Sequence, residues 1–217
     1  MRLQSARLLP LSLSCLGLAA GGACAQTVTY DNPIAFAAAT VALSLVSEDF
    51  ESANVAAGAI ANFASPLHAG TNNAVFAAGA MPVGVEIRSV PDSGGFTALG
   101  AGAVHFSIGP TASKMVLARD DVRAFDLLFS PPVTAVSLRA FSESDGVGIV
   151  VYGSSGLLAS VQVTAPGDSG GFFGVTSTTP ITRINVNAPD VTTSGNFEAI
   201  DDLRFGGGPL LFADGFE

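Results

Sequence analysis

The string Gly167–Gly171, which reads Gly-Asp-Ser-Gly-Gly, is the part of the sequence that most invites a catalytic interpretation. A serine between glycines suits acyl transfer, because glycine backbone amides can form an oxyanion hole beside the nucleophile. That chemistry also needs a histidine base, and the chain has two histidines, His68 and His105. Neither lies in a sequence context typical of that base. A secreted hydrolase that uses Ser169 is therefore an alternative and not the leading interpretation.

The same tetrapeptide, Asp-Ser-Gly-Gly, occurs twice, at residues 92–95 and 168–171, each time followed by phenylalanine. The second copy resembles the nucleophile loop of chymotrypsin-like serine proteases. Its repetition favours a simpler explanation, a shared turn. Asp and Ser side chains bond back to nearby backbone groups, and glycine supplies positive φ angles. The repeat therefore predicts two similar turns and needs no catalytic serine.

Two acidic strings, Glu48–Glu51 and Glu198–Asp202, are the candidates for glycosidase chemistry, which needs a pair of carboxylates on facing strands. Neither has the Glu-x-Asp-x-x-Glu spacing common in secreted sandwich enzymes. Carbohydrate binders also use stacking platforms of Trp and Tyr, and this chain has no Trp and only two Tyr. A glycosidase is thus the second form of the hydrolase alternative. Sugar binding stays open without positive support.

Composition limits the partners. The chain has 217 residues with 9 basic and 18 acidic side chains, a net charge of −9. Phosphate binding needs clustered Lys and Arg, so nucleic acid is excluded as a partner. The longest apolar stretch after the leader, Ile34–Val46, is shorter than the ~20 residues that span a bilayer, so no membrane span is expected in the mature chain. The 48% hydrophobic content suffices for a buried core.

Residues 1–25 have the pattern of a signal peptide. Arg2 and Arg7 form a basic region, an apolar run follows over Leu8–Ala20, and Ala23-Cys24-Ala25 is a small-x-small cleavage site. We expect a Sec-type signal cleaved after Ala25 and a secreted protein, extracellular, periplasmic or on the cell surface. Cleavage would remove both cysteines of the chain, so the mature protein would have no disulfide.

The elements expected in the mature chain are one short helix and many short strands. Asn32 and Pro33 predict a helix start over Ile34–Thr40. Gly153–Gly156 predicts a hairpin loop. The predicted strands are Leu45–Glu51, Val83–Val90, Ala103–Ile108, Phe125–Phe129, Val136–Phe141, Val147–Tyr152, Leu157–Val163, Phe172–Thr176, Arg183–Asn187 and Phe197–Phe205. Short strands with regular Gly, Pro and Ser punctuation indicate an all-β antiparallel sandwich of jelly-roll type with one N-terminal helix.

The predicted organisation is one domain over residues 26–206, followed by a Gly/Pro linker and tail over 207–217. The strand ending in Phe50-Glu51, the segment Phe125–Val136 and the final strand with Ile200-Asp201-Asp202 carry a family resemblance. The chain resembles secreted bacterial β-sandwich proteins of the PEP-CTERM-associated type and, more distantly, MAM and concanavalin-like jelly rolls. The tail departs from them, because Phe212–Glu217 looks like the Phe-x-x-Gly-Phe-Glu endings of other secreted bacterial proteins.

The resemblance implies a non-catalytic surface or extracellular-matrix binding module. Its ligand is an extracellular molecule that the sequence does not identify, with carbohydrate or another cell-surface component as candidates.

A structural calcium ion is the cofactor that this resemblance suggests. Asp201 shares its alternation with the apolar residues Phe197, Ala199, Leu203 and Phe205, and a lone buried carboxylate is costly unless paired or bound to metal. In MAM-like sandwiches the acids matching Glu51 and Asp201 meet at a cation, and Asp49 and Asp202 could complete an oxygen shell. The alternative is that Asp201 or Asp202 hydrogen-bonds a loop amide and Glu51 is solvated.

Overall fold

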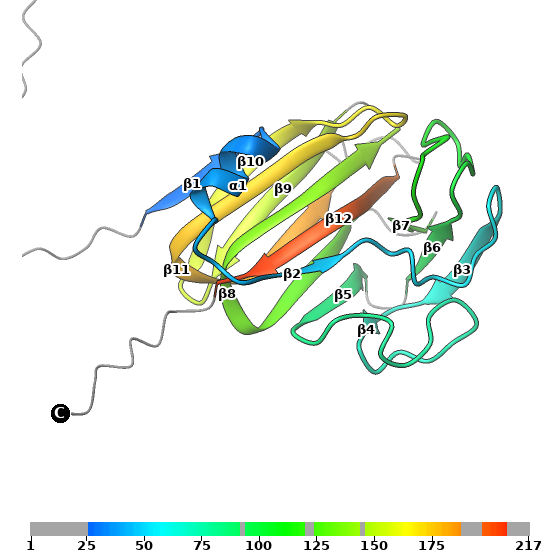
Figure 1. The fold of residues 1–217 in the computed structure, drawn as a ribbon, viewed down its shortest axis with the longest axis horizontal. Helices are drawn as coiled ribbons and strands as arrows, with labels where there is room; N and C mark the ends of the chain where they lie inside the picture. Colours follow the sequence, from blue (N-terminus) through cyan, green and yellow to red (C-terminus); the bar gives the residue numbers. More distant parts are fainter. Residues whose placement is uncertain (1–25, 92–93, 120–123, 144–145, 188–196, 208–217) are drawn as a thin grey trace, which may run out of the picture.

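The computed structural model describes residues 26–91, 94–119, 124–143, 146–187 and 197–207, and the predicted fold class is confirmed. The described part is an antiparallel all-β structure with one short helix (Figure 1). Its elements are β1 Thr27–Tyr30, α1 Pro33–Ala39, β2 Leu45–Glu48, β3 Ile60–Ala64, β4 Leu67–His68, β5 Val85–Val90, β6 Gly95–Leu99, β7 Met115–Ala118, β8 Ala124–Ser142, β9 Gly146–Gly153, β10 Gly156–Thr164, β11 Gly171–Asn187 and β12 Glu198–Gly206.

Two long strands, β8 and β11, connect the two layers of the sandwich. The first half of β11 pairs with the second half of β8, which also pairs with β12; β1 and β2 extend this first layer. The second half of β11 pairs with β9 and with the first half of β8, and β10, β5 and β4 complete the second layer. The β8–β11 ladder is irregular between these halves, where Pro131, Pro132 and Pro180 lie. Proline cannot donate to a ladder, so it marks the bend between layers.

The main hydrophobic core lies between the layers. Val136 and Val175 enter it from the first layer, and Leu127 and Ile184 enter it from the second. A smaller cluster lies on the other face of the first layer, where the loop over residues 100–111 covers β7 and β12. Its members are Leu99, Ala103, Ile108, Met115, Leu117, Phe141, Phe197 and Ala199. Both faces of the first layer are therefore buried at this end.

Several predicted elements are confirmed. The helix begins where expected, because the Asn32 side chain accepts hydrogen bonds from the backbone amides of Ile34 and Ala35 at 2.8 and 3.3 Å. The β9–β10 hairpin turns at Gly153–Gly156. The N-terminal strand β2 pairs antiparallel with the last strand β12.

The predicted strand over Ala103–Ile108 is wrong. This segment is a loop closed by a single bridge between His105 and Ile108, and Phe106 has a φ of 53°. Gly102 and Gly109 also adopt positive φ and turn the chain at both ends of the loop. Val104 and Phe106 are both exposed in this turn, so the apparent alternation of the segment does not mark a strand.

Some predictions concern residues that the structure does not describe. The signal peptide over residues 1–25, most of the tail over 207–217 and the first two residues of the Asp92–Gly95 turn lie outside the described residues. Within the described part, no helix is long and apolar enough to cross a membrane.

Candidate binding pocket under the N-terminal helix

Helix α1 rests on the outer face of the first layer through one residue, Phe36, which is 3% exposed. Its ring meets Tyr30 edge-on at 5.7 Å and Phe172 at 6.0 Å between ring centroids. The glycine beneath the ring, Gly174, lies on β11 between these contacts. Aromatic pairs at such distances add to the free energy of burial, so this trio fixes the helix on the sheet.

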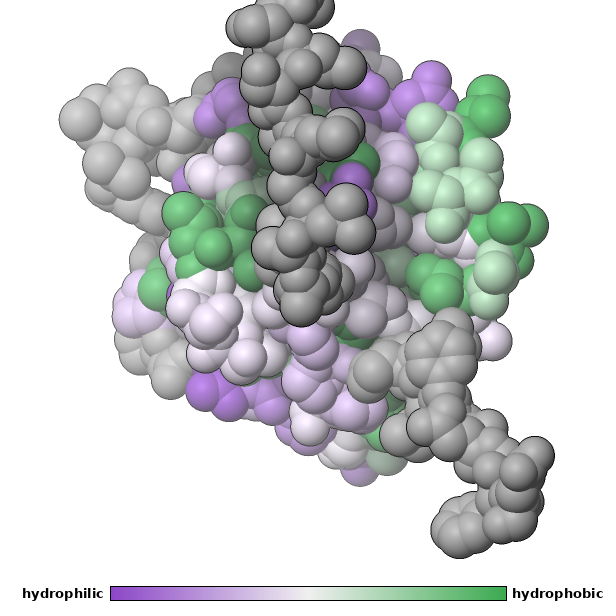
Figure 2. Space-filling view, turned by 90° about the vertical axis from the view of Figure 1, so that its left-hand side faces the viewer, coloured by the Kyte–Doolittle hydropathy of each residue, from purple (hydrophilic) through white to green (hydrophobic). Residues whose placement is uncertain are grey.

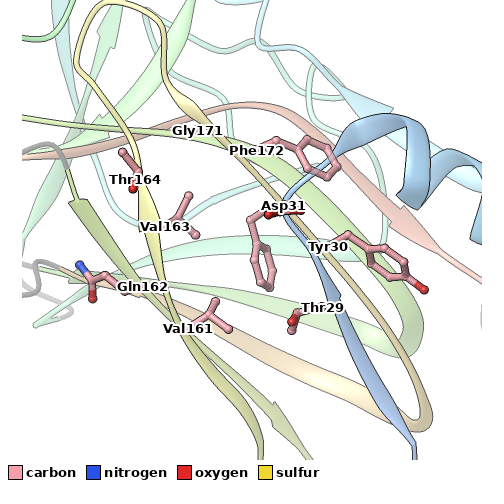
Figure 3. A pocket seen from close by; sticks show the side chains of 10 residues that line it. Thr29, Tyr30, Asp31, Val161, Gln162, Val163, Thr164, Gly171 and Phe172 are labelled. Carbon is pink, nitrogen blue, oxygen red and sulfur yellow. The ribbon is translucent and has the colours of Figure 1, made fainter. Parts of the chain in front are cut away.

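Two hollows flank the aromatic trio. The first, of about 600 Å³, lies between β1 and β10 and is shown in Figure 3. Its charged lining residue is Asp31, and Val161 and Val163 line it from β10. Figure 2 looks at this side of the molecule and shows hydrophobic residues in separate areas, with more polar residues between them. Among its lining residues, the first hollow has one acidic group, on Asp31, and no basic group.

The second hollow, called the helix pocket below, has a volume of about 650 Å³ and lies between α1 and the outer face of β8, β11 and β12. Phe36 and Phe172 form its apolar wall. Its polar lining residues are Thr40, Ser47, Ser137, Arg139, Asp202 and Arg204. Convergent polar groups beside an aromatic wall are typical of a ligand site.

Strand register brings these polar residues together. Arg204 of β12 pairs with Ser137 of β8 on one side and with Ser47 of β2 on the other, so the three side chains form a row across the sheet. Arg139 lies two residues from Ser137 and hence on the same face, where it pairs with Phe172 of β11. Paired residues have β-carbons about 5 Å apart. Two guanidinium groups therefore share one small area of sheet.

A β-bulge adds Asp202 to the pocket. The β12–β8 register shifts between Asp201 and Arg204, and Asp202 has a φ of 51°. The bulge corrects the alternation expected for this strand, because Phe197 and Ala199 pack in the smaller cluster and Leu203 and Phe205 in the main core. Bulges re-aim side chains in this way.

Among the described residues, the two pocket arginines have no ion-pair partner. Between described residues, the ion pairs are Arg88 with Glu86 and Arg183 with Asp126. Arg139 and Arg204 take part in neither, although both are exposed and lie in a strongly acidic chain. With Asp202 as the one acidic lining residue, the helix pocket has a local charge of +1.

The Asp168–Gly171 turn packs against the Arg139 side chain. Gly170 has a φ of 65°, its amide donates to the Pro166 carbonyl at 2.7 Å, and a β-carbon on it would lie 2.9 Å from the Arg139 side chain. Ser169 is exposed in this turn. The copy at Asp168–Gly171 therefore forms a turn with a positive φ at Gly170, as predicted, although the expected side-chain bonds from Asp168 and Ser169 to the backbone are not found among the described residues.

Neither histidine hydrogen-bonds Ser169 in the described structure. His68 Nδ1 accepts from the Gly70 amide at 2.9 Å. His105 Nδ1 is buried and has no hydrogen-bond partner in the part of the chain that the structure describes, and the His105 ring packs against Phe197 at 5.3 Å. The protease alternative gains no support from this geometry.

The residues predicted to bind calcium are partly brought together. Asp201 is 2% exposed, and Glu51 lies close enough that its charge raises the Asp201 pKa. Burial is the main cause of that rise, to about 6. Asp201 accepts hydrogen bonds from Ser113 Oγ at 2.5 Å and from the Asp202 amide at 2.7 Å.

The other residues predicted to bind calcium, Glu51, Asp49 and Asp202, have contacts elsewhere in the structure. Glu51 Oε1 accepts from the Lys114 amide at 2.8 Å, and an Asp49 oxygen accepts from the Glu51 amide at 3.1 Å. The Asp202 side chain lines the helix pocket. No group of three or more acidic, His or Cys side chains among the described residues is arranged to hold a metal. Calcium therefore stays a prediction, without support from this geometry.

Sequence reasoning missed the pocket arginines, and it considered Glu198 as part of an acidic string without predicting its burial. Arg139 alternates with the buried Leu138 and Ala140, a signal that places it on the outer face. Glu198 is fully buried, neither carboxyl oxygen has a hydrogen-bond partner among the described residues, and burial raises its pKa to about 8. No sequence pattern predicts the burial of Glu198, because that burial depends on elements distant in the chain.

No family model and no curated protein matches the chain. A solved structure, the K2 cleaved adhesin domain of Lys-gingipain, aligns with a TM-score of 0.43 and 12% identity. The alignment covers 75% of this chain and 99% of that one. A likeness this distant says nothing about the ligand of this chain.

Proposed function

We propose that the chain is a secreted, non-catalytic binding module for an extracellular or cell-surface component, and that the helix pocket is its binding site. The observation that supports this most is the pair of unpaired guanidinium groups, on Arg139 and Arg204, beside the Phe172 ring. An unpaired arginine at a surface is ordinary, whereas two in one hollow with hydroxyl and aromatic neighbours make a convergent site.

The rigidity of the site also supports a binding role. Arg139, Ser137 and Arg204 all project from the central strands β8 and β12, which are paired on both sides. Sites on regular strands are held more precisely than sites on loops, so less conformational entropy is lost on binding. Of the two hollows beside the aromatic trio, the helix pocket alone combines opposite charges, hydroxyl groups and an aromatic wall. A hollow on the second layer also contains opposite charges, but there Arg88 is already paired with Glu86.

The test is binding to an array of immobilised polysaccharides, glycosaminoglycans and matrix proteins. The double variant Arg139→Ala/Arg204→Ala should lose the binding of the wild type. The matched control is Arg88→Ala, which also removes a positive charge but lies on β5 in the other layer. Retained binding by the double variant would overturn the assignment of the helix pocket. Hydrolysis of an array component that is lost in Ser169→Ala would overturn the non-catalytic role.

A further inference from the structure

We infer that the helix pocket recognises the carboxylate of an acidic sugar, so that the ligand is a carboxylated glycan. This inference rests on the proposed function, because it names the ligand class of the same site. Arginine guanidinium groups bind carboxylates through two parallel N–H···O bonds, a geometry that lysine cannot offer. Arg139 and Arg204 are both free to make such bonds in the described structure.

The charge of the pocket favours a singly charged group. Asp202 offsets one of the two arginines, so the pocket carries +1 within a chain whose net charge is −9. The acidic chain repels a dense polyanion such as a heavily sulfated glycan, and screening weakens that repulsion only beyond about 10 Å. A carboxylate on a sugar ring matches the local charge and limits the repulsion elsewhere. The electrostatics therefore select a sugar acid over a sulfated polymer.

The uncharged part of the pocket suits a sugar ring. Ser47 lies beside Arg204, is exposed, and can donate to or accept from ring hydroxyls, whereas Ser137 on the other side of Arg204 is 2% exposed and forms the floor of the pocket. The Asp202 carboxylate can accept from a hydroxyl of the same ring. Phe172 pairs with Arg139 in the β11–β8 register, and its ring gives an apolar surface for the C–H face of the sugar. The carboxylate, the hydroxyl groups and the C–H face of a sugar acid thus each have a matching group in the helix pocket.

The probes that test this inference are trigalacturonic acid and its fully methyl-esterified form, in which a neutral methyl ester replaces each carboxylate. Calorimetric titration of the full mature chain should detect the acid and give at least about tenfold weaker binding of the ester, the order expected for a lost charge-assisted hydrogen-bond pair. Arg139→Lys and Arg204→Lys keep the charge but lose the two-pronged geometry, so each should also weaken binding. Arg88→Lys should leave binding unchanged.

The outcomes separate this inference from the proposed function. Equal binding of acid and ester, lost together in Arg139→Ala/Arg204→Ala, would overturn the carboxylate assignment and leave the pocket as the binding site. Tighter binding of heparin than of trigalacturonic acid would overturn the charge argument. Binding of an acidic peptide with no response to either sugar would overturn the glycan class. The melting temperature of every variant, measured alongside, verifies that the exposed substitutions leave the fold intact.

Discussion

A β-carbon on Gly174 would lie 2.7 Å from the Phe36 ring, so helix α1 can rest on the sheet because residue 174 has no side chain. The ring is held on its other sides by Tyr30 and Phe172 and has little room to move. The wall of the helix pocket thus depends on a contact between two residues 138 positions apart in the sequence.

Gly174→Ala should therefore destabilise the fold by roughly 1–3 kcal/mol, the usual cost of overpacking. Urea denaturation of the mature chain measures this change. Combining Gly174→Ala with Phe36→Leu makes room for the added methyl group, so the double variant should lose less stability than the two single changes sum to. Simple additivity would contradict the contact between ring and glycine.

Buried carboxyl groups should make the protein more stable in acid than at pH 8. Burial raises the pKa of Glu198 from 4.5 to about 8 and that of Asp201 from 3.8 to about 6, and it raises the pKa of Glu48 as well. Between these folded and unfolded values the folded state binds more protons. The free energy of unfolding therefore falls as the pH rises from about 4.5 to 8, and the Glu198 contribution levels off above that.

Glutamine at position 198 does not titrate. Glu198→Gln should therefore reduce the fall of the free energy of unfolding with rising pH, and it should raise the melting temperature at pH 8 relative to wild type. Asp168→Asn, at an exposed position, is the control and should keep the wild-type slope. Melting curves across this pH range measure both. A Glu198→Gln slope equal to that of the wild type would contradict the assigned cause.

The adjacent residues Ser169 and Gly170 should respond differently to alanine. Ser169 is exposed and makes no hydrogen bond within the described structure, so Ser169→Ala should change stability by no more than about 0.5 kcal/mol. Gly170→Ala places a side chain at a φ of 65° and within 2.9 Å of the Arg139 side chain, so it should lower both stability and ligand binding. Labelling of Ser169 by a fluorophosphonate probe would instead support a serine hydrolase.

The calcium prediction is tested by melting curves with EDTA and with added calcium. If the ion binds at Glu51 and Asp201, EDTA lowers the melting temperature, calcium restores it, and Glu51→Gln weakens the response. Identical curves would contradict the prediction. Ser113 and the Asp202 amide would then be the partners that make burial of Asp201 tolerable.

Local signals in the sequence predicted the helix and the β9–β10 hairpin correctly. Asn32-Pro33 places the helix and Gly153–Gly156 the hairpin, because capping and turn formation depend on a few neighbouring residues. The alternation around Asp201 predicted its burial correctly but not the bulge, which exchanges the faces of the strand halfway along. A bulge depends on the partner strand β8, and no pattern within β12 marks it.

The helix pocket could not be predicted for the same reason. Arg139 and Arg204 are 65 residues apart, and they become neighbours through the β8–β12 register. Their wall comes from Phe36, which reaches the sheet through the gap left by Gly174. Each of these contacts joins distant parts of the chain, whereas the calcium prediction had a family resemblance to link Glu51 with Asp201.

The most direct test of the binding site is nuclear magnetic resonance of the arginine side chains. The Nε–H signals of the mature chain are assigned with single Arg→Lys variants and followed while trigalacturonic acid is added. The helix pocket predicts that the signals of Arg139 and Arg204 shift together with one binding constant, while those of Arg88 and Arg183, which have acidic partners elsewhere, stay in place. Shifts confined to Arg88 or Arg183, or unchanged signals for Arg139 and Arg204 at saturating sugar, would contradict it.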